Sequence, residues 1–221
     1  MTSVALVTID TQRDTLDGGP LEIVGTSAVI SGIARLCAAF RAAGLPIVHV
    51  VRLYNADGSN AEPARRDLVS GPTPILRPGT PGRLLAPGLL PADDIDLDDE
   101  RLLAGQVQTV GQREFVMYKP RWGAFYGTSL DEHLRQRAVG SIVLCGCNFP
   151  NCPRTTIYEA SERDYGVVLV SDAVSGLYER GEEEMSNIGV ELRSVDEVVA
   201  GLDAIRRDHE VDGHDHRPVD A

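Results

Sequence analysis

The chain has 221 residues, of which 43% are hydrophobic and 5% aromatic, and its formal net charge is −12 at pH 7. This length fits one α/β domain with a largely aliphatic core. The acidic charge excludes a nucleic-acid partner, because phosphate binding needs a basic surface. No leader peptide or membrane-spanning apolar run is visible and the four cysteines suggest reduced thiols, so we expect a cytoplasmic protein without a membrane partner.

The first part of the chain alternates between strand and helix. Residues 4–9 (VALVTI) form an apolar run that predicts a buried parallel strand, and Asp10 follows it directly. Residues 26–43 place apolar side chains at helical spacing, and residues 47–51 predict a second strand. With right-handed crossovers this order predicts a three-layer αβα, Rossmann-like fold, whose doubly wound parallel sheet has about six strands.

Residues 54–91 are rich in proline and glycine and show no regular pattern. So long an irregular stretch inside a compact domain is typical of a lid, a binding loop or an oligomer contact. A simple surface excursion is the alternative. We predict that this segment forms a lid or the interface of a homo-oligomer, either a dimer or a tetramer.

The alternation resumes after this segment. Strands are predicted over 114–118, 141–145, 167–171 and 190–194, and helices over 129–137, 153–164, 182–188 and 195–208. Ser129 is a candidate N-cap, with Glu132 at the capping-box position. The polar residues 209–221 predict a disordered tail, which leaves 1–208 as the domain.

Three reactive side chains are expected at one edge of the sheet. Asp10, Lys119 and the loop 146–152 each follow a predicted strand, and ligands of open parallel sheets bind outside the carboxyl ends of the strands. Pro153 is favoured in the first turn of a helix, which places Cys152 at the N-cap or first helical position. Free N–H groups and the helix dipole favour a thiolate there.

These residues suggest a nucleophilic site. The Cys152 thiol would attack a carbonyl, Asp10 would take the thiol proton and later give it to a leaving amine, and Lys119 would stabilise the thiolate. The alternatives are structural: a buried cysteine, a loop-anchoring aspartate and a surface lysine. Cys145 and Cys147 form a C-x-C-x4-C cluster with Cys152, but no matching Cys or His pair lies nearby, so we expect no metal and no cofactor.

On these residues the chain resembles the isochorismatase-like cysteine hydrolases, in particular N-carbamoylsarcosine and ureidoacrylate amidohydrolases. The resemblance covers residues 4–194 and is carried by VALVTID, VMYKPRWGAF and GCNFPNCPRTT. It implies an Asp10–Lys119–Cys152 triad that opens a C–N bond of a small amide, carbamoyl, ureido or lactam substrate through an acyl-enzyme on the cysteine.

The resemblance also implies details of the loop before the nucleophile. A cis peptide is implied at Cys147–Asn148, and the backbone N–H groups of Asn148 and Cys152 are implied as the oxyanion hole. Phe149–Pro150 is a second candidate for a cis bond on local grounds alone.

Two departures narrow the function. The family loop commonly reads T-N-x-C-V, whereas Pro150, Asn151 and Pro153 here make the backbone stiffer. Nicotinamidases carry an Asp-x-His metal site after the second strand, and residues 51–55 (VRLYN) offer no such ligands. The branch that cleaves the vinyl ether of isochorismate does not need a cysteine, so Cys152 favours amide or ureido chemistry.

Substrate contacts are predicted from proximity to the triad in sequence. Arg154 either recognises an anionic substrate group or pairs with a neighbouring acid. A vinyl-ether hydrolase and a non-catalytic or redox-regulatory member of the fold remain as alternative functions. The predicted substrate-binding residues are Arg13, Trp122, Phe125, Tyr126, Asn151 and Arg154, with Arg52 as a further candidate.

Overall fold

The computed structural model describes residues 3–212, with side chains as far as residue 204. Seven strands form one sheet in the order β3-β4-β2-β1-β5-β6-β7, and helices cover both faces, which confirms the predicted αβα fold. The strands are β1 (Ser3–Ile9), β2 (Ile47–Val51), β3 (Gln108–Gly111), β4 (Glu114–Tyr118), β5 (Val139–Gly146), β6 (Gly166–Val174) and β7 (Glu191–Arg193). Every pairing is parallel except that of β3 with β4. The sheet therefore has an antiparallel edge strand beyond the six expected.

The central strands are apolar because both of their faces are covered. In β1, Ala5, Val7 and Ile9 join one core cluster, while Leu6 joins the cluster on the opposite face. β2 and β5 flank β1 in parallel register, with Leu6 opposite Ile47. Because the three strands run parallel, their carboxyl ends lie at the same edge of the sheet.

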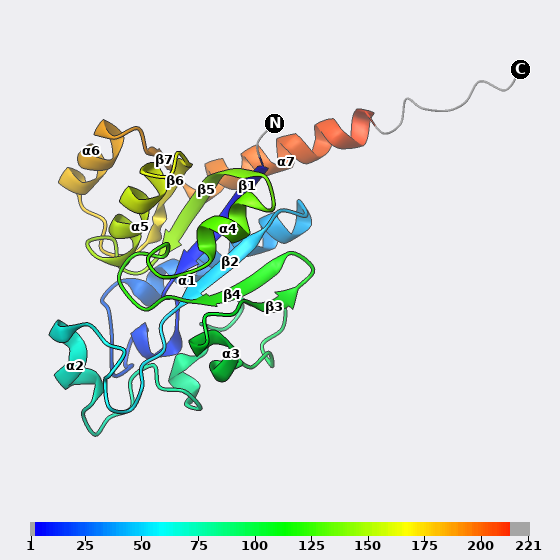
Figure 1. Cartoon of the computed structure of the whole chain (residues 1–221). Helices are drawn as coiled ribbons and strands as arrows, with labels where there is room; N and C mark the ends of the chain where they lie inside the picture. Colours follow the sequence, from blue (N-terminus) through cyan, green and yellow to red (C-terminus); the bar gives the residue numbers. More distant parts are fainter. Residues whose placement is uncertain (1–2, 213–221) are drawn as a thin grey trace, which may run out of the picture.

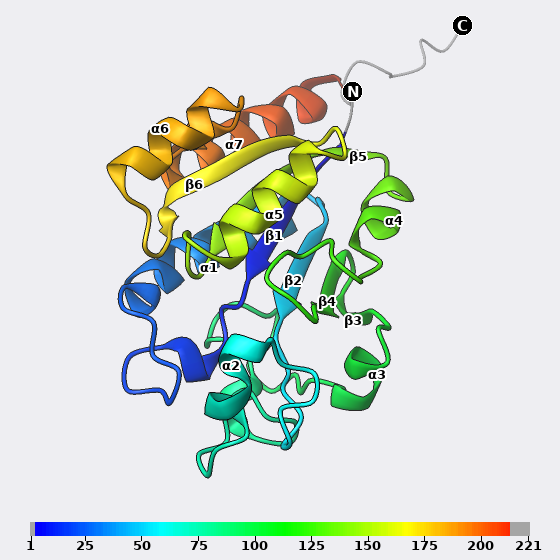
Figure 2. The ribbon, with the colours of Figure 1, turned by 60° about the vertical axis from the view of Figure 1, so that its left-hand side comes forward.

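The helices divide between the two faces of the sheet (Figures 1 and 2). Helices α1 and α7 pack on one face through the cluster that contains Leu36 and Val198, and α4, α5 and α6 pack on the other through the cluster that contains Leu134 and Ile157. Among the described helices, none is long and apolar enough to cross a membrane. The helices are α1 (Thr26–Ala42), α2 (Pro63–Val69), α3 (Asp99–Leu103), α4 (Leu130–Arg135), α5 (Cys152–Ser161), α6 (Glu179–Asn187) and α7 (Val195–Asp212).

Some predicted boundaries differ from the structure. Ser129 makes no capping hydrogen bond to α4, and Thr128 Oγ1 instead accepts one from the Leu130 N–H at 3.3 Å. Helix α7 runs to Asp212, four residues beyond the predicted domain end, and residues 213–221 of the predicted tail lie outside the described residues.

Residues 54–76, which we call the cap, lie beyond the carboxyl ends of the strands (Figure 2). The stretch predicted to be irregular contains α2 and a 3-10 helix at Pro81–Arg83. The cap has a small apolar cluster of its own, which includes Tyr54, Val69 and Leu76. The buried carboxylate of Asp14 anchors it by accepting the Leu76 N–H at 2.6 Å.

Candidate active site

Asp10 and Lys119 meet above the end of β2. The Asp10 N–H donates to the Val50 carbonyl at 2.9 Å, and the Lys119 N–H donates to the Val51 carbonyl at 3.0 Å. Because β2 lies between β1 and β4, these bonds place Asp10 and Lys119 on either side of the last two residues of β2. Their side chains form a buried ion pair, with Lys119 Nζ 2.8 Å from Asp10 Oδ2.

The loop from Gly146 to Cys152 brings the thiol to the same edge. A Cβ on Gly146 would lie 2.2 Å from the Ile9 carbonyl oxygen, so only glycine allows β5 to approach β1 this closely. The Cys147–Asn148 peptide is cis, as the resemblance implied, and Phe149–Pro150 is not among the cis bonds of residues 3–212. Cys152 is the first residue of α5, as Pro153 predicted.

The electrostatics of this site favour a protonated thiol in the resting protein. Burial and the neighbouring Asp10 charge raise the pKa of Cys152 to about 12, although Lys119 acts to lower it. This corrects the expectation of a resting thiolate, since burial and Asp10 outweigh the cation and the start of the helix. Burial also acts to lower the pKa of Lys119, but the charges of Asp10 and Cys152 raise it above its ordinary value.

One carboxylate oxygen of Asp10 is free to accept a proton. Asp10 Oδ1 is buried without a hydrogen-bond partner in the described part of the chain, while Oδ2 is held by Lys119. The Asp10 carboxylate also accepts a hydrogen bond from the Cys152 thiol, which helps to raise the pKa of Cys152. The arrangement can therefore move a proton from sulfur to carboxylate while Lys119 holds the carboxylate in place.

Asp10 and Cys152 border a cavity of ≈ 10 Å³, about the space of one water molecule. It is almost closed, because residues from the cap and from the segment after Asp14 cover it. A substrate can reach the thiol only if some of these side chains move. The lining includes Asp10, Arg52, Arg65, Leu76, Asn148 and Cys152.

The predicted substrate contacts divide into two groups. Asn148 lines the cavity, and the Asn151 side-chain amide donates to Asn148 Oδ1 at 3.2 Å. Trp122 is half-buried beside the cap, and its ring lies 4.7 Å from the Arg65 guanidinium carbon. Arg13 instead borders another small cavity and donates to the Leu85 carbonyl.

Two aromatic residues and Arg154 also do not line the cavity beside Asp10 and Cys152. Phe125 is buried in the core beside Tyr165, with 5.7 Å between ring centroids, and Tyr126 is 59% exposed. Arg154 pairs with Glu184 at 2.5 Å and donates to the Tyr178 hydroxyl at 2.7 Å. Of the two roles considered for Arg154, the structure therefore shows the pairing with a neighbouring acid, which ties α5 to α6.

Several cavity residues were not predicted from the sequence. Arg65, Thr15 and Leu76 line the cavity, and Glu62 of the cap pairs with Arg52 at 2.5 Å. Three of these lie in the stretch without periodicity, so no pattern in the sequence marks them. Among the described residues, no group of three or more His, Cys, Asp or Glu side chains is arranged to hold a metal ion.

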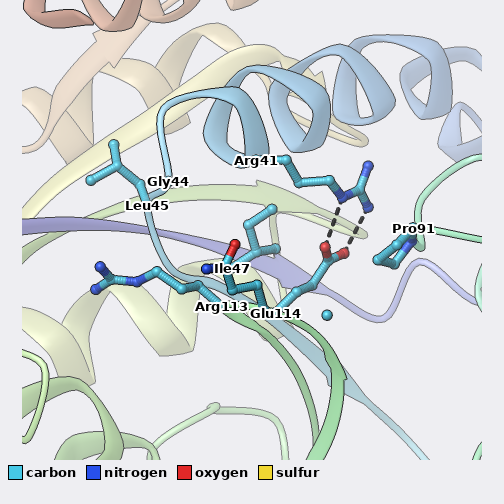
Figure 3. Close-up of a pocket in the computed structure, with 9 residues that line it drawn as sticks. Arg41, Gly44, Leu45, Ile47, Pro91, Arg113 and Glu114 are labelled. Atoms are coloured by element: carbon cyan, nitrogen blue, oxygen red, sulfur yellow. Dashed lines mark hydrogen bonds and ion pairs between the residues drawn. The ribbon is translucent and has the colours of Figure 1, made fainter.

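A roomier cavity of ≈ 220 Å³ lies at the opposite edge of the sheet, where β2 and β4 begin (Figure 3). Two of the charged side chains that line it already pair with each other, because the Arg41 guanidinium donates to both carboxylate oxygens of Glu114 at 2.7 Å. Glu114 Oε1 also contacts His49 Nε2 at 2.8 Å, and His49 Nδ1 contacts Thr8 Oγ1 at 2.9 Å. This buried polar chain joins α1, β1, β2 and β4 and contains no member of the triad.

Comparison with known proteins finds relatives that match most of the chain. A "probable inactive nicotinamidase" of Arabidopsis thaliana is 27% identical over 88% of this chain and 94% of its own length. A ureidoacrylate amidohydrolase of Methylorubrum extorquens is 30% identical over 77% of this chain and 69% of its own. The crystal structure of an isochorismatase family protein from Desulfovibrio vulgaris is 35% identical, with a TM-score of 0.76 over 90% of this chain and all of that one. The model of the isochorismatase domain matches residues 4–196, and the chain therefore belongs to the isochorismatase family.

Proposed function

We propose that the protein is an amidohydrolase that opens a C–N bond of a small amide, carbamoyl, ureido or lactam substrate through a thioester on Cys152. The observation that carries this proposal is the free Oδ1 of Asp10 beside a thiol whose pKa is raised to about 12. A thiol that is protonated at rest needs a base at the moment of attack, and this carboxylate oxygen is available for it.

The reaction begins when the Cys152 sulfur attacks the substrate carbonyl and its proton passes to Asp10. The backbone N–H groups of Asn148 and Cys152 receive the developing oxyanion. Asp10 then gives the proton to the departing nitrogen, the C–N bond breaks, and a thioester remains. Water attacks this thioester with Asp10 as base, the acid product leaves, and the thiol is restored.

Lys119 acts as a fixed positive charge in this scheme. Its raised pKa keeps it protonated, and because it binds Asp10 Oδ2, Oδ1 is left without a hydrogen-bond partner among the described residues and is available for the proton transfer. It also favours the thiolate as that charge forms, since it acts to lower the pKa of Cys152. The similarity to the ureidoacrylate amidohydrolase of Methylorubrum extorquens supports amide chemistry for this chain.

The test is a screen of primary amides, ureides and cyclic amides with the native protein and the Cys152→Ala variant. We expect turnover and an acyl adduct on Cys152 by mass spectrometry, and neither in the variant, whose circular dichroism should be unchanged. Full activity in Cys152→Ala would refute the proposal. Pyruvate released from isochorismate by that variant would instead support the ether hydrolase.

We also propose that the protein works in the cytoplasm as a homo-oligomer. The four cysteines are free in the structure, which is consistent with a reducing compartment. Sedimentation equilibrium of the native chain tests the assembly, and a monomer at micromolar concentration would contradict it.

A further inference from the structure

Two ion pairs form around the cavity beside Asp10 and Cys152, and one further cation near it has no carboxylate partner among the described residues. Asp10 pairs with Lys119, and Arg52 binds Glu62 through both carboxylate oxygens at 2.5 and 2.6 Å. Arg65 also lines the cavity, but among the described residues no carboxylate pairs with it. The cavity of a strongly acidic protein thus carries one unbalanced positive charge.

The contacts that Arg65 does make are weak. Its guanidinium stacks 4.7 Å from the centre of the Trp122 ring, and Nη1 lies 3.5 Å from the Tyr54 hydroxyl. A cation–π contact at a partly exposed site contributes little, and a hydrogen bond at 3.5 Å is at the limit of the interaction. By contrast, Arg52 is saturated, because it also donates to the Arg121 carbonyl at 2.6 Å.

We propose that Arg65 binds an anionic group, most simply a carboxylate, on the substrate whose C–N bond is opened. This inference rests on the proposed function and adds the class of substrate to it. A guanidinium presents paired N–H donors that match a carboxylate, and Trp122 supports its plane. A monoanionic substrate would balance the charge of the closed site, whereas a neutral one would leave Arg65 partly desolvated and without a counter-charge.

The position of Arg65 in the cap would connect the charge of the substrate to closure of the cap over the site. It belongs to α2 of the cap, whereas Asp10 and Lys119 follow β1 and β4 and Cys152 begins α5. The cavity holds about one water molecule, so some of the side chains that line it must move for a substrate to enter, and Arg65 and Leu76 of the cap are among the lining residues. A carboxylate bound by Arg65 would attach the cap to the substrate, and the cap would then exclude water from the thioester.

The experiment compares two alkylating reagents that differ in charge, iodoacetate and iodoacetamide. Both react with thiolates, and the modification of Cys152 is followed by peptide mass spectrometry at pH 9. The variants are Arg65→Met and, as matched control, Arg66→Met. Arg66 lies next to Arg65 on α2 but is exposed and does not line the cavity, so both variants lose one positive charge from the same helix.

We expect Arg65→Met to lower the ratio of iodoacetate to iodoacetamide rates about tenfold, the loss of one charge-assisted contact, and Arg66→Met to change it less than twofold. In parallel, the native enzyme should hydrolyse succinamate faster than butanamide, and Arg65→Met should remove that preference. Equal rate ratios in the two variants would overturn the role of Arg65 while leaving the amidohydrolase intact. Cys152 that reacts with neither reagent would contradict the nucleophile itself, and this inference with it.

Discussion

The buried pair of Asp10 and Lys119 gives the sharpest test of how the site is held together. Lys119 is fully buried, the Asp10 side chain is 8% exposed, and 2.8 Å separates Nζ from Oδ2. Removing one member leaves an uncompensated charge in the interior, which destabilises a protein by about 3–5 kcal/mol. We therefore expect Asp10→Asn and Lys119→Met each to lower the free energy of unfolding by that amount.

The double variant separates this pairing from simple loss of packing. Once both charges are gone, no unpaired charge is buried, so the double variant should be more stable than the sum of the single effects by at least about 2 kcal/mol. All three variants should lose turnover, because each removes either the base or the charge that positions it. Urea denaturation followed by circular dichroism measures the stabilities, and hydrolysis of the best substrate measures activity.

An exposed ion pair supplies the control. Arg35 and Asp196 lie 2.6 Å apart, but their side chains are 58% and 80% exposed. Asp196→Asn should therefore change the free energy of unfolding by at most about 1 kcal/mol. Strict additivity of the Asp10 and Lys119 effects, or activity within tenfold of native in Asp10→Asn, would refute the reasoning.

Three further predictions concern titration and the polar chain under α1. Since the pKa of Cys152 is about 12, its alkylation by iodoacetamide should accelerate about tenfold per pH unit from pH 7 to 10; a plateau below pH 8 would contradict this. Burial and Arg137 lower the pKa of His133 to about 4, so stability measured in urea should fall from pH 6.5 toward 4, where only the unfolded chain gains this proton, and His133→Gln should flatten the decline. Glu114→Gln should lower the free energy of unfolding by about 3 kcal/mol without changing turnover more than twofold, and a large loss of turnover would show that this distant chain affects the triad.

The sequence predicts those parts of the fold and site that depend on local pattern. The bounds of β2 and β4 follow from continuous apolar runs between turn residues, and both agree with the structure. The triad follows from the same logic, since residues directly after parallel strands must share an edge. Cys152 at the start of α5 follows from the preference of proline for the first turn.

The remaining features depend on contacts between distant segments. β3 is only four residues long and partly polar, so its pairing with β4 gives no periodic signal. The raised pKa of Cys152 comes from burial by other elements and from Asp10, neither of which its neighbours in sequence reveal. Phe125 and Tyr126 are adjacent in a loop, and only tertiary packing decides that the first is buried and the second exposed.

The separate cluster of the cap has a consequence for how such a protein can change. Tyr54, Val69 and Leu76 pack together apart from the two cores that support the sheet, yet this segment contributes Arg65 and Leu76 to the lining of the cavity beside the thiol. Mutations in the cap can therefore alter which molecules are accepted without endangering the strands that hold the triad. Under the proposed role of Arg65, a residue of the cap sets substrate preference while the proposed triad lies outside the cap, so one can diverge while the other is retained.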